Sequence, residues 1–216
     1  MTKTILVSTL IGMSLWAWTG GIGLAPILLA QSEKADQQGW ISLFNGKDLT
    51  GWKMAGPGHF TVEDGALRTH GGMGLLWYSQ RTFRDFILQV EWKVTRQNDN
   101  SGIFVRFPDP GNDPWIAVRQ GHEIQIQDDR DPTHRTGAIY NFAPSTKVAS
   151  KPAGQWNLFE IRVVGKTYTV TLNGETVCQW EDTGGRPLEG YIGLQNHDEK
   201  SVVYFRNIRV KEIGGR

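Results

Sequence analysis

The chain lacks three features that would each point to a common class of protein. It has one cysteine, Cys178, so no disulfide can form within the chain. It has no run of basic residues and a formal net charge of only +1, which argues against nucleic acid as a partner. Behind residue 30 it has no apolar pattern long enough for an amphipathic helix of four turns. These absences favour an all-β protein with a small neutral partner.

The long apolar run of the chain lies at its N-terminus. Lys3 is the only charge before Glu33, and the residues from Ile5 to Ala30 are mostly apolar. This order is typical of a signal peptide cleaved after Ala30, although a run of this length can also span a bilayer. We therefore expect residues 1–30 to be a signal peptide or an N-terminal anchor. The folded part is then periplasmic or extracellular, and it meets a membrane only through this segment, if uncleaved.

Behind the leader, the sequence predicts one domain. Residues 31–38 are polar and predict a linker, and residues 39–213 follow without a repeat or a change of composition. About 185 residues suit a single all-β domain and leave little room for two. Cys178 lies in an apolar segment, and we expect it to serve as a small hydrophobic residue of a strand.

Apolar and polar residues alternate along much of this domain. The clearest segments with a period of two are 86–94, 103–107, 123–127, 159–163 and 168–172. Asn173-Gly174 separates two strand-like segments and predicts a tight type I′ hairpin. We expect the first strand in residues 40–44 and the last in 202–210. Many short strands with glycine-rich turns predict a β-sandwich or a barrel.

One segment, HEIQIQD, combines this alternation with polar chemistry. If Ile124 and Ile126 face the core, then Glu123, Gln125 and Gln127 form a row on the opposite face, with neighbours about 7 Å apart. One acid and two amides suit a hydroxyl-rich ligand on a concave sheet face. Ordinary glycoside hydrolysis uses a pair of carboxylates, and this strand supplies only one. The segment therefore argues against an ordinary glycosidase.

Six segments resemble, in their order and spacing, the 3-keto-disaccharide hydrolase family, also known as domain of unknown function 1080. They are GWISLFNGKDLTGWK, NSGIFVR, HEIQIQD, TGAIYNFAP, WNLFEIRVVGKTYTVTLNGETV and GYIGLQNHDEKSVVYFRNIRV. The resemblance extends from Gly39 to Val210. It implies a two-sheet antiparallel jelly-roll sandwich of the concanavalin and laminarinase type, and an exported hydrolase of 3-keto-glycosides or 3-keto-disaccharides. Asn141 and Asp198 stand where glycine is common in the family, so substrate preference could differ.

A 3-keto sugar makes a single carboxylate sufficient. The C3 ketone acidifies the proton on C2, and the C1 oxygen becomes a leaving group β to the carbonyl. We expect Glu123 to be the base and Arg106, on the outward face of its strand, to hold the enolate oxygen as a fixed cation. His197 would be the acid or an orienting donor. The bond would break by direct hydrolysis or by elimination followed by hydration.

Contacts to a small carbohydrate substrate are expected from four further polar residues: Gln125, Gln127, Tyr140 and Asn100. Trp52, Trp77 and Trp115 flank loops with glycine or proline, where an aromatic ring could stack on a sugar. The sequence contains nine tryptophans, most of which must belong to the core. No cofactor is expected.

Simpler interpretations of these residues stay open. Arg106 and Glu123 could form an ordinary cross-strand ion pair, and His197 could be a loop histidine without a catalytic role. The charged residues 128–131 favour a solvated loop, and a divalent cation there is left open. Two other classes compete with the enzyme, a non-catalytic carbohydrate-binding module of the envelope and an adhesion or scaffold domain.

Overall fold

The computed structural model describes Met1 and residues 35–214. The expected signal peptide or anchor, residues 1–30, lies outside the described residues apart from Met1, as does the first part of the expected linker. Among the residues described, no helix is long and apolar enough to cross a membrane.

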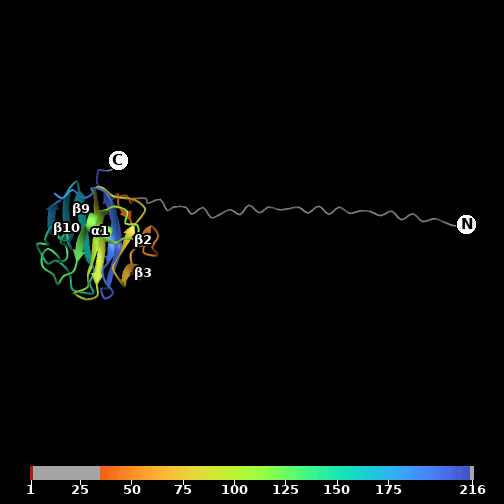
Figure 1. Ribbon diagram of the computed structural model, residues 1–216, viewed down its shortest axis with the longest axis horizontal. Coiled ribbons are helices and arrows are strands. Elements are labelled where there is room, and N and C mark those ends of the chain that lie inside the picture. The colour runs from red at the N-terminus through yellow and green to blue at the C-terminus, as the bar shows by residue number, and fades with distance from the viewer. Residues whose placement is uncertain (2–34, 215–216) are drawn as a thin grey trace. The chain divides into compact units, whose positions relative to one another are not determined.

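Residues 35–214 form two antiparallel sheets and one short helix (Figure 1). The eight-stranded sheet has the order β11 (Glu175–Glu181), β10 (Thr167–Leu172), β9 (Asn157–Val164), β6 (Phe86–Val94), β13 (Val203–Glu212), β4 (Ala66–His70) and β3 (His59–Glu63), with β1 (Ile41–Ser42) paired to β13. The five-stranded sheet has the order β2 (Trp52–Ala55), β5 (Gly74–Tyr78), β12 (Tyr191–Asn196), β7 (Ser101–Phe107) and β8 (His122–Ile126). The prediction of a two-sheet antiparallel sandwich is confirmed.

The core lies between the sheets and is built from the alternating apolar residues. Along β6 every second side chain, from Phe86 to Val94, is buried, and the intervening residues are half-buried. The same alternation in β9 and β10 supplies further core residues, because successive side chains of a strand point to opposite faces. Cys178 is buried in this core, and burial raises the pKa of its thiol. Its predicted role as a small hydrophobic residue is confirmed.

The tight hairpin joins β10 to β11 as predicted. Leu172 pairs with Glu175, and the two residues between them, Asn173 and Gly174, both have positive φ, 52° and 88°. Positive φ at both central positions is the requirement of a type I′ turn, and it favours this pair of residues. The first strand is shorter than expected, because only Ile41–Ser42 of residues 40–44 pairs in a sheet.

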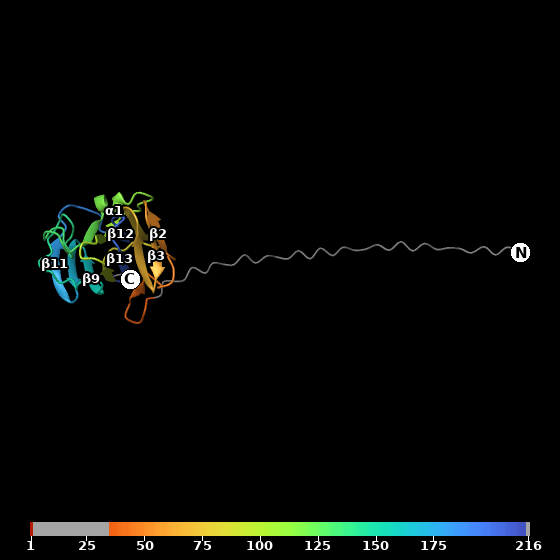
Figure 2. The same cartoon turned by 90° about the horizontal axis from the view of Figure 1, so that it is seen from below.

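The helix α1 (Trp115–Gln120) covers part of the outward face of the five-stranded sheet. Figure 2 shows α1 on the side of β12 that lies away from β13. Its Ala117 packs with Leu75, Trp77, Phe104 and Phe107 in a second, smaller apolar cluster. The helix has six residues, too few for the periodic pattern by which a helix is found from sequence.

Candidate active site

The strand β8 has the register that the HEIQIQD segment predicts. Ile124 and Ile126 are fully buried in the core between the sheets. Glu123 and Gln125 alternate with them and therefore lie on the outward face of the five-stranded sheet. Gln127 follows directly after β8 and continues the alternation. The predicted row of one acid and two amides is thus on the face away from the core.

Neighbouring strands bring further polar residues beside this row. Gln125 of β8 pairs with Gly102 of β7, and Leu194 of β12 pairs with Ile103 of β7. When the pairing of β12 with β7 is continued by one residue, Gln195 lies opposite Gly102, on the side of β7 away from β8. The resulting polar patch consists of Glu123, Gln125, Gln127, Asn100, Gln195 and His197. At strand spacings of about 4.8 Å and about 7 Å between alternate residues, it spans roughly 10 by 14 Å, which is the scale of a disaccharide.

Gly102 makes room for the Glu123 side chain at the centre of the polar patch. A Cβ atom at Gly102 would lie only 2.2 Å from Oε1 and 2.7 Å from Cγ of Glu123. The carboxyl group therefore lies over the bare backbone of β7, between Gln125 on one side and Gln195 on the other. The glycine is required here for space, since its φ is not in the left-handed region.

The environment of Glu123 makes it a weaker acid than an ordinary carboxyl group. Glu123 is only 7% exposed. Burial raises the pKa of its carboxyl group from 4.5 to about 8. A hydrogen bond with the Gln195 side chain lowers the pKa but offsets only part of this effect. A carboxyl group whose pKa lies near the working pH is suited to general acid–base catalysis.

Two amide oxygens of the polar patch have no hydrogen-bond partner. Gln195 Oε1 and Asn100 Oδ1 are both buried, and no donor within the described residues reaches either atom. An unsatisfied buried acceptor costs about 1–3 kcal/mol, and such groups are uncommon in folded proteins. Sugar hydroxyl groups are donors of the kind that would satisfy them.

His197 lies at the end of β12 and is held by its neighbour. Its Nδ1 lies 2.8 Å from Asp198 Oδ2, and both side chains are about one third exposed. Burial on its own raises the pKa of Asp198, but hydrogen bonds from His197, Ser201 and Lys200 outweigh it and bring the pKa to about 2. The ionised carboxylate fixes the imidazole orientation and leaves Nε2 as the nitrogen that can meet a ligand.

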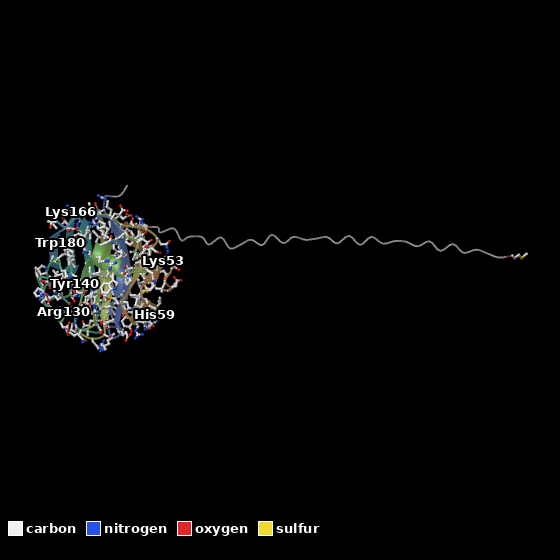
Figure 3. All side chains as sticks on the ribbon, in the orientation of Figure 1. Lys53, His59, Arg130, Tyr140, Lys166 and Trp180 are labelled. Carbon is white, nitrogen blue, oxygen red and sulfur yellow. The ribbon has the colours of Figure 1, made fainter. Side chains whose placement is uncertain are left out.

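Tyr140 borders the polar patch from the loop that runs along the free edge of β8. Its backbone N–H donates to the Glu123 carbonyl at 2.9 Å, and Figure 3 labels Tyr140 in the orientation of Figure 1. Its ring packs against His134, which bonds to Asp131 at 2.7 Å and to Asn141 at 2.8 Å. Asn141 has a φ of 64°, a conformation that favours glycine.

Arg106 does not lie on the outward face, and this part of the prediction is wrong. A bulge in the pairing of β7 with β12, together with a φ of 57° at Arg106, turns its side chain inward. The guanidinium is fully buried and donates to the backbone carbonyls of Arg84 and Gly165 and to Asp85 Oδ1 at 2.9 Å. The alternative of a cross-strand ion pair with Glu123 is wrong as well, because Asp85 is the ionic partner.

The three loop tryptophans have different environments. Trp52 and Trp77 are buried, whereas Trp115 is 47% exposed at the start of α1. With Phe104 and Gln195, Trp115 lines a small hollow of about 10 Å³ beside the polar patch. Trp115 is therefore the one of the three that is placed to stack on a ligand.

Two of the charged residues 128–131 make side-chain contacts within the protein. Asp131 binds His134, and Asp128 accepts a hydrogen bond from Ser150 at 2.6 Å. Across residues 35–214, no group of three or more His, Cys, Asp or Glu side chains is arranged to hold a metal ion.

Sequence reasoning missed two residues that shape this site, Gly102 and Gln195, and named Asp198 only as a departure from the family pattern. Gln195 had a usable signal, because it lies two residues before His197 in a strand and so shares its face. Gly102 had none, since its importance depends on which side chain the fold places beside it.

Comparisons with known proteins show the family of this chain. Residues 39–211 match the sequence model of a family described as 3-keto-alpha-glucoside-1,2-lyase-like domain. A protein of Bacteroides thetaiotaomicron named 3-keto-disaccharide hydrolase is 29% identical over 234 residues, covering 82% of this chain and 80% of its own length.

Solved structures give the same fold. A crystal structure from Parabacteroides distasonis, provisionally assigned as a glycosyl hydrolase, is 25% identical with a TM-score of 0.71, covering 86% of this chain and 98% of the other. A carbohydrate-binding module from Bacillus subtilis has a TM-score of 0.55 at 15% identity, covering 75% of this chain and 96% of its own. The second likeness concerns the fold alone.

Proposed function

The chain belongs to the 3-keto-alpha-glucoside-1,2-lyase-like domain family, and from this premise we propose that it cleaves the glycosidic bond of 3-keto-glucosides and 3-keto-disaccharides on the polar patch. The observation that carries the proposal is the single buried carboxyl group at the centre of that patch. Glu123 has a pKa raised to about 8, and no second carboxylate belongs to the patch.

Glu123 is the base in this proposal. The C3 ketone makes the C2 proton acidic, and the ionised carboxylate removes it to give an enolate. The enolate re-forms the ketone as the C1–O bond breaks, which creates a C1=C2 double bond and releases the second sugar. The leaving oxygen takes up a proton, for which His197, oriented by Asp198, is the donor. Water then adds at C1 and a proton returns to C2, so the net reaction is hydrolysis.

The developing charge on the C3 oxygen needs a donor other than Arg106. Gln125 is our candidate, because its side-chain oxygen already accepts a bond from the Ile126 N–H at 3.2 Å. Its amide N–H groups are left to donate to the ligand. Preorganised donors at the position of a developing oxyanion contribute strongly to catalysis.

The names of the relatives are consistent with this chemistry. A 1,2-lyase acts by elimination across C1 and C2, and a 3-keto-disaccharide hydrolase gives the hydrated product. Elimination followed by hydration joins the two, and it requires one base where an ordinary glycosidase requires two carboxylates.

A non-catalytic carbohydrate-binding module is the second candidate function. The two unpartnered amide oxygens favour it as much as they favour an enzyme, since they concern binding only. It predicts sugar binding without turnover, and binding that survives loss of the basicity of Glu123.

The test compares a 3-keto-disaccharide with its unoxidised parent. Wild-type protein should cleave only the keto sugar, and Glu123→Gln should lower turnover by about 10²-fold or more, the scale of general-base catalysis, with substrate binding kept. In heavy water the product should carry deuterium at C2, because the C2 proton exchanges through Glu123. Cleavage of the unoxidised parent, or a product without deuterium at C2, would falsify the elimination mechanism.

Export is proposed as well. Removal of residues 1–30 gives a mature chain that begins near Gln31. Mass spectrometry of envelope material should find that N-terminus. An intact apolar segment would support a membrane anchor instead.

A further inference from the structure

A second, larger hollow begins where the polar patch ends. It measures about 460 Å³ and lies between the loop that joins β6 to β7 and the loop that joins β12 to β13. It is lined by Arg96, Asn98, Asp198, Glu199, Lys200 and Ser201. Asp198 follows His197 directly, and Asn98 precedes Asn100 by two residues, so this loop groove adjoins the polar patch. None of its lining residues is aromatic or aliphatic.

Internal hydrogen bonds fix the two loops that form the loop groove. The fully buried Asp99 accepts bonds from the backbone N–H groups of Thr95 and Arg96 at 2.9 and 2.8 Å, and pairs with the Arg96 guanidinium at 2.7 Å. Arg96 also donates to the Lys200 carbonyl, which ties one loop to the other. A site that exists before the ligand arrives loses less entropy on binding.

Ser201 joins the loop groove to the polar patch. Its Oγ accepts a bond from the Asn100 N–H at 2.8 Å and donates to Asp198 Oδ2 at 2.8 Å. Asp198 in turn holds His197. The residue proposed as the acid is therefore attached to the wall of the loop groove.

Three lining side chains are free to bind a ligand. Asn98, Glu199 and Lys200 are exposed, and the side chains of these three make no hydrogen bond or ion pair with the described residues. They offer an amide, a carboxylate and an ammonium group, which together can donate to and accept from several hydroxyl groups.

The geometry of the proposed reaction determines which part of the substrate meets the loop groove. The oxidised ring must lie over Glu123, and the bond to be broken must lie between Glu123 and His197. The leaving sugar then extends past His197, away from Glu123. A volume of about 460 Å³ is within the range of about 300–1,000 Å³ that is usual for small-molecule sites.

We infer that the loop groove binds the leaving sugar of the disaccharide and selects a hydroxyl-rich leaving group over an alkyl or aryl one. This inference rests on the proposed function, because it uses the direction in which the bond breaks. It adds a binding site for the half of the substrate that is not oxidised.

The experiment compares two substrates that differ only in the leaving group, 3-keto-trehalose and methyl 3-keto-α-glucoside. The double variant Asn98→Ala/Lys200→Ala should lower kcat/KM for the disaccharide about tenfold, as expected for the loss of two hydrogen bonds of about 0.5–1.5 kcal/mol each. It should leave kcat/KM for the methyl glycoside within about twofold. Lys166→Ala, which removes an exposed lysine between β9 and β10, is the matched control and should affect neither substrate.

The outcomes separate the two proposals. If wild-type protein cleaves neither substrate, the proposed function fails and the loop groove inference fails with it. If wild-type protein cleaves both and the double variant slows both equally or slows neither, only the loop groove inference is overturned.

Discussion

The outward faces of both sheets carry amide and carboxyl side chains, but the two faces differ in whether these groups have hydrogen-bond partners. On the eight-stranded sheet, Gln89 and Glu91 are bonded to neighbouring side chains. Gln89 donates to Glu160 at 2.8 Å and accepts from Arg209 at 2.8 Å. Glu91 accepts from Arg206 at 2.7 Å and from Asn207 at 2.8 Å. On the five-stranded sheet, buried amide oxygens of the polar patch lack partners.

Trp156, Trp40 and Trp115 show a related contrast. On the eight-stranded sheet, Trp156 lies 3.9 Å from the Arg206 guanidinium, and Trp40 lies 4.7 Å from that of Arg209. These contacts are cation–π interactions, which contribute about 0.5–1 kcal/mol at exposed sites. Trp115, beside the polar patch, has no cation over its ring within the part of the chain that the structure describes.

A search for the larger hollow would have placed the active site on the wrong sheet. The eight-stranded sheet carries a groove of about 580 Å³, lined by Trp40, Leu158 and the bonded side chains of Gln89 and Glu91, among others. The hollow beside Gln195 is much smaller, at about 10 Å³. A groove whose polar groups bond to one another stabilises the fold, whereas unpartnered buried acceptors indicate a ligand site. The following predictions test this contrast.

The largest effect concerns the pH dependence of stability. Between pH 4.5 and 8 the folded protein holds a proton on Glu123 that the unfolded chain has already lost, so stability falls as the pH rises through this window. The full shift corresponds to roughly 5 kcal/mol by the usual conversion. Chemical denaturation across this range should show the decline in wild-type protein and not in Glu123→Gln.

Glu91 on the other face supplies the control with the opposite sign. Burial on its own raises its pKa, but bonds from Asn207 and Arg206 outweigh this and lower it below 4.5. Its contribution is present above pH 4.5 and is lost as the pH falls. Equal slopes in wild-type and Glu123→Gln protein between pH 4.5 and 8 would contradict the assignment of the slope to Glu123.

The next effect is on turnover. In Gly102→Ala the added methyl group would lie 2.2 Å from Glu123 Oε1, so the carboxyl group must move. Displacing a catalytic group by about 1 Å can cost about 10²-fold in rate. Steady-state kinetics on a 3-keto-disaccharide should show this loss while thermal unfolding stays close to that of wild type. Full activity would mean that the position of Glu123 over Gly102 is not the active one.

A smaller effect is expected for Gln195→Met, which keeps the size of the side chain and removes its amide. One lost hydrogen bond to substrate should lower kcat/KM about tenfold, in line with about 1.5 kcal/mol. Because the Gln195 bond lowers the pKa of Glu123, the pH at which activity rises should also move upward. Stability should not fall, since an unpartnered buried acceptor is removed. An unchanged pH profile would indicate that Gln195 does not act through Glu123.

The smallest effect is expected for the matched amide of the other face. Gln89→Met breaks the bonds to Glu160 and Arg209 and should cost about 1 kcal/mol of unfolding free energy. Its kcat/KM should stay within about twofold of wild type. A kinetic loss as large as that of Gln195→Met would show that the two faces do not differ in function as proposed.

The parts of the molecule that follow from local pattern were predictable from the sequence. The alternation in residues 86–94 gave β6, Asn173-Gly174 gave the hairpin, and the isoleucines of HEIQIQD fixed the face on which Glu123 lies. In each case one local rule decides the result, because a strand with one buried face can pair in only one register.

Arg106 and α1 show what local pattern leaves out. The alternation in residues 103–107 placed Arg106 outward, but the bulge turns it toward the carbonyls of Arg84 and Gly165, which lie 22 and 59 residues away in the sequence. Only the folded chain brings these acceptors together. The two unpartnered oxygens in the polar patch were equally unpredictable, since being unpartnered depends on every neighbouring group.

The buried Cys178 has a practical consequence for measuring the binding of substrate. Its thiol is enclosed between the sheets, and burial raises its pKa, so it should react slowly with thiol reagents. The sequence contains no other cysteine. A cysteine introduced at the exposed Gln97, directly before Asn98, would then take up a fluorescent label with little background. Such a label would report the arrival of substrate in the loop groove in real time.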